Sequence, residues 1–258
     1  MTGKWTKFPY PDKRFVYAGD ALAKAWPRLH RGDCEALPKS ANAQDAWRAF
    51  HAGDFAQAVE AGRAAGAAGV NAAIKAQAIY ATYLETRDAA RLARYEEAAQ
   101  WADERRNAAP RDANAHYLYA YALGRYSQKS SVAKALAQGY GGKIKEALQT
   151  ALALAPKHAD AHAAFGAYQA EVIDKVGAMV GGLTYGAKKD SAIEHFETAR
   201  KLFPDSAIER IEYANGLLLL FGKSRIADAQ KLYEDAARVA PADAMERLDV
   251  ELAKSELA

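Results

Sequence analysis

Four prolines beyond residue 41 follow alanine-rich amphipathic segments at regular distances. They are Pro110, Pro156, Pro204 and Pro241, and successive positions are 46, 48 and 37 residues apart. Proline lacks the amide hydrogen that continues a helix, and it disfavours helical geometry in the residue before it, so each one marks a helix end. A small polar run and a new apolar stripe follow each proline. This periodicity predicts an all-α chain of repeated helix pairs.

Acidic residues follow the same prolines by one to four positions. They are Asp112, Asp160, Asp205 and Asp243. Carboxylates are favoured at helix N-termini, where backbone amides have no partner within the helix. We therefore expect these residues to be caps or first-turn acids of the next helix.

Two segments carry small and aromatic residues at the spacing of a known repeat. The matching positions are Ala192, Phe196, Ala199 and Pro204 in one, and Ala229, Tyr233, Ala236 and Pro241 in the other. This pattern resembles the tetratricopeptide repeat (TPR), a helix-turn-helix unit of about 34 residues. The resemblance implies a TPR-like helical-hairpin solenoid of about five helix pairs plus a C-terminal capping helix. It also implies that Ala199 and Ala236 lie where the two helices of a unit meet.

The chain divides by composition into three parts. Residues 1–40 are an aromatic and basic N-terminal extension, 41–241 are the repeat array, and 242–258 form a charged capping helix. Two glycine-rich insertions, near 127–142 and 171–190, lie between paired helices and predict bends or loops there. A polar last helix is what a solenoid needs to cover its open apolar end.

The apolar insertion before Ala192 carries a second, narrower resemblance. It is similar to the arrangement in the regulator-of-microtubule-dynamics group of TPR proteins and its bacterial relatives. The resemblance covers roughly His116 to Pro241. The group name implies no microtubule function for this chain, whose alanine-rich composition is typical of a bacterial protein.

Charge and composition exclude several classes of function. The 258 residues carry a formal net charge of +3 and 26% charged residues, without the concentrated basic stripe of a nucleic-acid-binding protein. The single cysteine, Cys34, excludes an intramolecular disulfide. We find no signal-peptide core and no run near the roughly 20 apolar residues of a membrane span. The sequence therefore predicts a soluble, cytoplasmic protein.

The N-terminal extension is rich in aromatic residues, which a free solvated tail lacks. We predict that Trp5, Phe8 or Phe15 packs on the repeat array. The segment either caps the first helix or lies in the groove as an internal ligand.

Catalytic and metal-binding patterns are weak. Cys34 follows His30 by four residues, but the intervening glycine favours a turn over a nucleophile–base pair. His158 and His162 have the spacing of a zinc-binding pair, yet His162 shares its repeat position with His116, which favours packing or capping. We predict no metal site.

Two glycine stretches also fail the phosphate-loop pattern. Residues 139–143 are followed by Ile144 where the motif needs Ser or Thr, and 181–186 are followed by Ala187 where it needs Lys. We predict no cofactor and no enzymatic activity.

Aromatic and polar residues on first helices give the best candidate binding site. First helices line the concave face of a TPR array, and a run of four residues falls on one face of such a helix. The candidate partner-binding residues are Asn114, Tyr117, Tyr121 and Arg125 in that run, with Trp47, Phe50 and Asn215 in other units. Alternatively, the tyrosines bury against the insertions or the extension, and Trp47 and Phe50 belong to the core.

These observations favour a non-enzymatic scaffold that binds a protein or peptide in its concave groove. The Lys, Asn and Arg clamp of chaperone-tail binders is missing, since the corresponding faces carry Ala163, Ala167 and Ile211. An alternative is a small-molecule or lipid-binding protein in which the apolar insertion, residues 172–185, closes a pocket.

Overall fold

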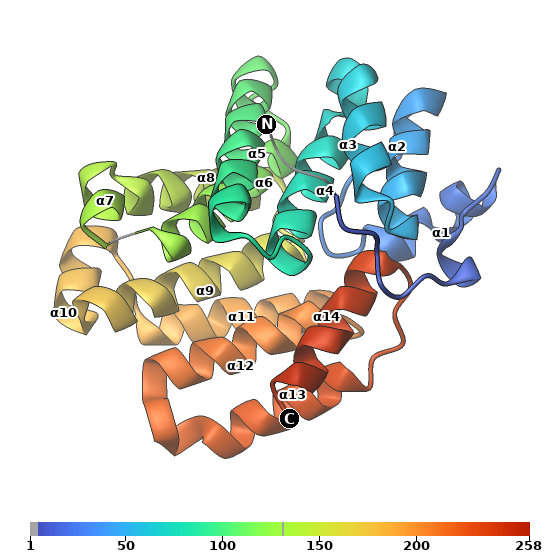
Figure 1. The fold of residues 1–258 in the computed structure, drawn as a ribbon. Coiled ribbons are helices and arrows are strands. Elements are labelled where there is room, and N and C mark those ends of the chain that lie inside the picture. The colour runs from blue at the N-terminus through green and yellow to red at the C-terminus, as the bar shows by residue number, and fades with distance from the viewer. Residues whose placement is uncertain (1–4, 131) are drawn as a thin grey trace. The chain divides into compact units, whose positions relative to one another are not determined.

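The computed structural model describes residues 5–130 and 132–258, and its regular elements are helices (Figure 1). No β-strand occurs within these ranges. The predicted all-α class is therefore confirmed. In the same ranges, no helix combines the length and the apolar character required to cross a membrane.

The chain forms two compact units, each assembled from more than one segment. The first unit contains residues 5–30, 35–130, 132–140 and 242–245. The second contains residues 31–34, 141–241 and 246–258. The N-terminal extension thus belongs mainly to the first unit, and most of the last helix belongs to the second.

Helical hairpins build the first unit. Its elements are η1 (Lys13–Phe15), α1 (Ala21–Leu29), α2 (Ala41–Ala52), α3 (Phe55–Ala64), η2 (Gly66–Ala68), α4 (Val70–Tyr83), α5 (Asp88–Ala108), α6 (Ala113–Lys129) and α7 (Val132–Ala137). Gly53 ends α2 with φ +85°, a conformation that glycine adopts without strain. Asp54 then caps α3 by accepting a hydrogen bond from the Gln57 amide. Helix α4 packs on α3, α5 and α2, and α6 packs on α5 and α4.

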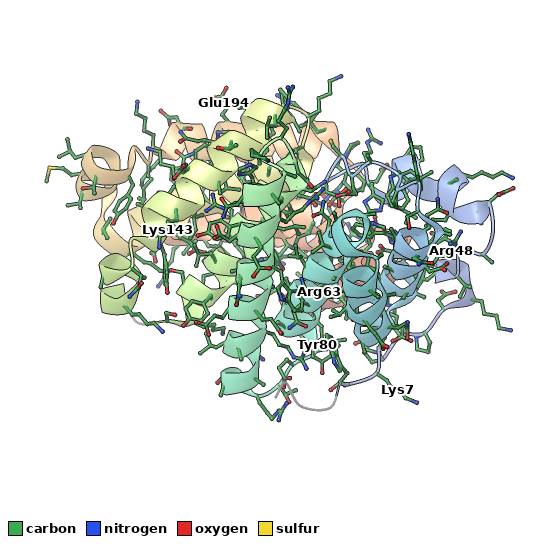
Figure 2. All side chains as sticks on the ribbon, turned by 90° about the horizontal axis from the view of Figure 1, so that it is seen from above. Lys7, Arg48, Arg63, Tyr80, Lys143 and Glu194 are labelled. Atoms are coloured by element: carbon green, nitrogen blue, oxygen red, sulfur yellow. The ribbon has the colours of Figure 1, made fainter. Side chains whose placement is uncertain are left out.

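The N-terminal extension packs on these hairpins, as the sequence predicted. The ring of Trp5 lies 4.2 Å from that of Tyr80 on α4 (labelled in Figure 2), and the Thr6 amide donates to the Tyr80 hydroxyl at 2.7 Å. The Arg94 guanidinium lies 4.0 Å from the Trp5 ring centroid. Phe8 contacts Phe55 edge to face. Aromatic residues therefore fix the extension at successive points along the first unit.

The second unit contains two further hairpins and the end of the chain. Its elements are α8 (Tyr140–Leu154), α9 (Ala159–Val176), α10 (Ala178–Val180), η3 (Gly181–Tyr185), α11 (Lys189–Leu202), α12 (Ala207–Phe221), η4 (Gly222–Arg225), α13 (Ile226–Ala237) and α14 (Ala244–Ser255). Helix α9 pairs with α11 and α12 with α13, and the first helices α9 and α12 also pack together.

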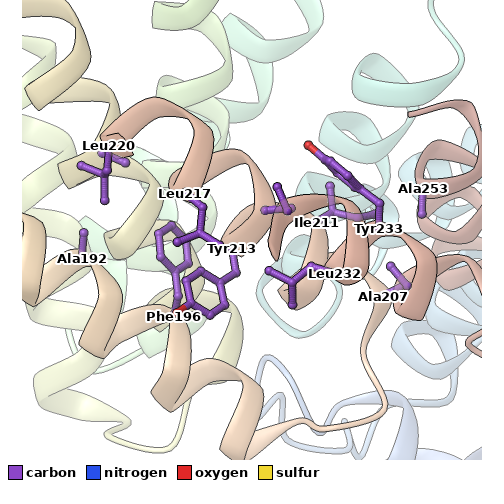
Figure 3. Packing of buried hydrophobic residues seen from close by; sticks show 14 of the residues in the cluster. Ala192, Phe196, Ala207, Ile211, Tyr213, Leu217, Leu220, Leu232, Tyr233 and Ala253 are labelled. Carbon is purple, nitrogen blue, oxygen red and sulfur yellow. The ribbon is translucent and has the colours of Figure 1, made fainter. Parts of the chain in front are cut away.

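Phe196 on α11 lies at the centre of the second unit's core (Figure 3). Its ring stacks on that of Tyr213 with centroids 5.3 Å apart. Gly166 on α9 and Gly216 on α12 face the same ring, because a Cβ at either position would collide with it. Ala199 and Ala236 are fully buried, as predicted for positions where helices meet.

Residues two positions after the prolines cap the first helices. Asp112, His158 and Ser206 each accept a hydrogen bond from the amide three residues later. Asp112 is thus the predicted cap, and Asp160 lies in the first turn of α9. At the third junction the cap is Ser206 and not Asp205, because the residue with extended backbone geometry there is the serine.

Residues six positions after the prolines bind the proline carbonyl groups. His116 Nε2 lies 3.0 Å from the Pro110 oxygen, and His162 Nε2 lies 3.1 Å from the Pro156 oxygen. Arg210 makes the same contact with Pro204. The shared repeat position of the two histidines therefore serves a structural contact at a helix junction, as the sequence indicated.

The tip of the second insertion is exposed. Gly177 (φ +82°) and Gly186 (φ +67°) bracket α10 and the π-helical turn η3. Val172 and Ile173 contribute to the core at the base of this insertion. Met179 and Leu183 at its tip are 76% and 85% exposed, whereas a lid over a pocket would bury them.

Candidate functional site

A group of tyrosines lies where the C-terminal ends of α4 and α6 meet α5 in the first unit. We define this tyrosine cluster as Tyr95, Tyr117, Tyr121, Tyr126, Thr82 and Arg125. Helical periodicity aligns three of its members on one face of α6, since Tyr117, Tyr121 and Arg125 are spaced by four residues. Of the other members, Thr82 lies on α4, Tyr95 lies on α5, and Tyr126 follows Arg125 on α6.

Thr82 is the hydrogen-bond centre of the tyrosine cluster. Its hydroxyl donates to the Ala78 carbonyl at 2.9 Å and accepts from the Tyr95 hydroxyl at 3.1 Å. The Tyr121 hydroxyl lies 3.0 Å from the same Thr82 oxygen. A hydroxyl has one proton, which Thr82 gives to Ala78, so Tyr121 must also donate to Thr82. The free lone pairs of the Tyr121 oxygen therefore remain available as acceptors.

Basic side chains lie over the rings of the tyrosine cluster. The Arg125 guanidinium is 5.3 Å from the Tyr121 ring centroid and donates to the Gln128 side-chain oxygen at 3.3 Å. Lys134 on α7 donates to the Tyr126 hydroxyl at 2.7 Å. These cations place positive charge beside the aromatic faces of the cluster.

Burial sets the protonation of the tyrosine cluster. It raises the pKa of Tyr95 to about 12, with the neighbouring Tyr121 as the second cause. The hydrogen bond to Tyr126 raises the pKa of Lys134. At neutral pH the tyrosines of the cluster therefore keep their protons, and the hydroxyls of Tyr95 and Tyr121 give theirs to Thr82.

The candidate residues of α6 differ in exposure. Tyr121 and Arg125 are partly exposed, whereas Asn114 and Tyr117 are buried. Tyr117 contacts the Tyr121 ring, with centroids 6.2 Å apart. A partner can therefore contact Tyr121 and Arg125 directly, whereas the buried Tyr117 packs against the Tyr121 ring.

The assignment of Trp47 and Phe50 to a partner-binding face is corrected by their burial. Both are 1% exposed, and Trp47 lies edge to face with Trp26, with centroids 5.8 Å apart. His30 packs on the same Trp47 ring. The N-terminal extension supplies Trp26 and His30, so it covers the face of α2 that the repeat register left open. Trp47 and Phe50 therefore belong to the core, which was the alternative interpretation of the sequence.

Asn215 forms a hydrogen bond within its own hairpin. Its side-chain oxygen accepts a hydrogen bond from the Tyr233 hydroxyl, which joins α12 to α13. Asn215 is partly exposed, but it belongs to the second unit and not to the tyrosine cluster.

Thr82 and Tyr95 were missed by the sequence argument. They lie on α4 and α5, and no periodicity within one helix connects them with Tyr121. The available signal was the concentration of tyrosines between residues 80 and 126, which points to a shared surface without giving the pairing.

The cysteine and histidine residues of the weak catalytic and metal-binding patterns form contacts with neighbouring protein groups. Cys34 donates its thiol to the Lys157 carbonyl at 3.4 Å, and burial raises the pKa of that thiol. His162 Nδ1 lies 2.8 Å from His195 Nδ1. Burial lowers the pKa of both histidines, that of His195 to about 4. Across the residues that the structure describes, no group of three or more His, Cys, Asp or Glu side chains fits a metal ion.

The chain is similar to known proteins in fold and in sequence. The structure resembles that of a thermophilic TPR protein from Thermus thermophilus with a TM-score of 0.57. The match covers 83% of this chain and 97% of that one at 15% identity, so it shows a shared fold. No curated protein matches the sequence. The family described as Regulator of microtubule dynamics protein 1-3 matches residues 73–252, from α4 to α14. The chain therefore belongs to the Regulator of microtubule dynamics protein 1-3 family and has a TPR-like fold.

Proposed function

We propose that this protein is a non-enzymatic scaffold that binds a protein or peptide through the tyrosine cluster. The observation that carries the proposal is the partly exposed pair of Tyr121 and Arg125, held by Thr82 and by the ring of Tyr117. Tyrosine and arginine supply large contact area together with hydrogen bonds, and they are enriched among residues that dominate binding energy. The TPR-like fold supports this class of function, because a helical repeat array offers an extended surface to a partner.

Fixed side chains favour affinity at this site. The Tyr121 hydroxyl is already oriented by Thr82, and its ring lies between Tyr117 and Arg125. A partner therefore meets groups whose conformational entropy is already reduced, which lowers the entropic cost of binding. Carboxylate and main-chain carbonyl groups on the partner suit Arg125, and main-chain N–H groups suit the Tyr121 oxygen, which is left as an acceptor.

The test is affinity purification from the native host with the full chain as bait. The double variant Tyr121→Ala/Arg125→Ala should lose its partner, since hot-spot residues cost about 2 kcal/mol or more each. Arg238→Ala is the matched control, because Arg238 is an exposed arginine at the end of α13 that forms ion pairs with Glu234 and Asp235 of the same helix. Retention of the same partner by a folded double variant would place the binding site elsewhere.

A further inference from the structure

Exposed apolar side chains gather at the turns of the two hairpins of the second unit. Met179, Val180 and Leu183 lie in the α9–α11 turn. Leu219 and Ile226 lie at the α12–α13 turn, beside η4. Large apolar side chains that group on one surface of a folded protein mark an interaction site more often than single exposed ones do.

Both turns lie at the same end of the second unit. The Lys189 ammonium at the start of α11 donates to the Leu220 carbonyl near the end of α12 at 2.6 Å. It also lies 5.0 Å from the ring centroid of Phe221. Since α9 and α12 pack along one another, the two turns form one surface. We call residues 175–189 and 219–226 the turn surface.

The apolar side chains of the turn surface protrude. A side chain in a docking groove is enclosed by the walls of that groove, but Leu183 keeps 85% of its accessible surface and Met179 keeps 76%. The turn surface therefore has the form of an element that inserts into its partner. A bilayer interface is fluid and accepts separate apolar tips, whereas a protein would need a shaped pocket for each tip.

The charged residues of the turn surface indicate which kind of interface it fits. The exposed Asp174 and Asp190 adjoin the first segment of the turn surface, which itself contains the basic residues Lys175, Lys188, Lys189, Lys223 and Arg225. Some are engaged, since Lys175 pairs with Glu171 and Arg225 with Asp228, while Lys188 and Lys223 are exposed. Basic side chains beside inserted apolar ones favour anionic lipid headgroups, and their long stems reach the headgroup level.

We propose that the turn surface docks peripherally on an anionic lipid bilayer, with Met179 and Leu183 inserted among the headgroups and acyl chains. Gly177 and Gly186 permit the sharp turns that hold these side chains away from the helices. Lys188 and Lys223 then supply the electrostatic part of the attraction. The tyrosine cluster belongs to the other unit, so this proposal does not depend on partner binding there.

The experiment is co-sedimentation of the full chain with vesicles of phosphatidylcholine alone or with about one third phosphatidylserine. Wild type should bind the anionic vesicles more strongly, and binding should fall as salt is raised, because salt screens the basic side chains. Met179→Asp/Leu183→Asp should weaken binding by about tenfold or more, since the full burial of even one such apolar side chain is worth about that factor. Leu154→Asp is the control, an exposed leucine at the end of α8 outside the turn surface.

Both variants change exposed side chains, so a circular dichroism spectrum like that of wild type should accompany the binding data. Lys188→Glu/Lys223→Glu should remove the preference for anionic vesicles. Two results would overturn the proposal. One is that wild type sediments with neither vesicle type. That result would indicate that the apolar side chains of the turn surface bind a pocket on a protein. The other is equal binding by wild type and the Met179→Asp/Leu183→Asp variant.

Discussion

The ring of Phe196 occupies the space that a side chain at Gly166 would need. A Cβ at position 166 would lie 2.9 Å from Cε1 of Phe196, closer than such contacts allow. This contact lets α9 approach α11 and places an aromatic ring between two first helices. It joins the small-residue position of one helix with the aromatic position of the next, which is the packing that the repeat pattern implied.

Gly166→Ala should therefore destabilise the protein by about 1–3 kcal/mol through overpacking, although alanine is the better helix former. Gly124→Ala is the matched control, because Gly124 lies within α6 and a Cβ there meets nothing within 4 Å. That variant should be neutral or more stable by up to about 1 kcal/mol. Urea unfolding of both variants measures the difference, and equal stability of the two would refute the packing argument.

Ala236→Leu tests the second hairpin in the same way. Ala236 is fully buried where α13 meets α12, so a larger side chain should cost about 1–3 kcal/mol. Ala227→Leu in the same helix changes an exposed position and should shift the free energy of unfolding by less than about 0.5 kcal/mol. Thermal unfolding reports both, and an unchanged melting temperature for Ala236→Leu would place that residue outside the contact.

Phe8→Ala tests the docking of the N-terminal extension. Phe8 lies on Gly53 and faces Phe55 edge to face, so its loss should destabilise the first unit by about 1–3 kcal/mol. Lys7→Ala, the exposed neighbour, should have little effect. Deleting residues 1–40 should have a much larger effect, because it also removes buried Leu22 and Trp26. A truncated chain as stable and monodisperse as the full one would contradict the docking.

Glu209→Gln tests a buried carboxyl group. Burial, followed by the nearby Asp160, raises the pKa of Glu209 well above its ordinary value. The unfolded chain ionises this group near pH 4.3, while the native state still holds its proton, so stability falls as pH rises above about 4.3. The fall is at most about 1.4 kcal/mol per pH unit and ends at the raised native pKa.

Glutamine cannot ionise, so the stability of Glu209→Gln relative to wild type should increase between pH 4 and pH 8. Glu197→Gln, at an exposed position on α11, is the control and should follow wild type. Denaturant unfolding across this pH range measures both. A constant difference between Glu209→Gln and wild type would mean that Glu209 titrates alike in the native and unfolded states.

Sequence periodicity predicted the hairpins because each depends on local signals. Gly53 needs only its own backbone freedom, and Ala199 and Ala236 repeat a spacing set by one helix turn. The burial of Trp47 depends on Trp26, which reaches it from the extension across a change of chain direction. Such contacts follow from tertiary packing, which no helical period encodes.

The candidate site was predicted only in part, because local periodicity gives one helix face and tertiary packing gives the rest. Tyr121 and Arg125 share a helix face, so their alignment follows from the period of α6. Their link to Thr82 and Tyr95 depends on how α4, α5 and α6 pack. The tyrosine cluster therefore combines one face that the sequence predicts with supports that only the fold reveals.

Site-specific photo-crosslinking tests the central claim most directly. A photoreactive phenylalanine at the exposed Gln128 removes one hydrogen bond of Arg125 but keeps the side chains of Tyr121 and Arg125. In native extract it should capture the partner that affinity purification identifies, and capture should be lost when Tyr121→Ala/Arg125→Ala is added. The same group at exposed Gln230 on α13 should not capture that partner. Equal capture from both positions, or capture that survives the double variant, would contradict a binding site at the tyrosine cluster.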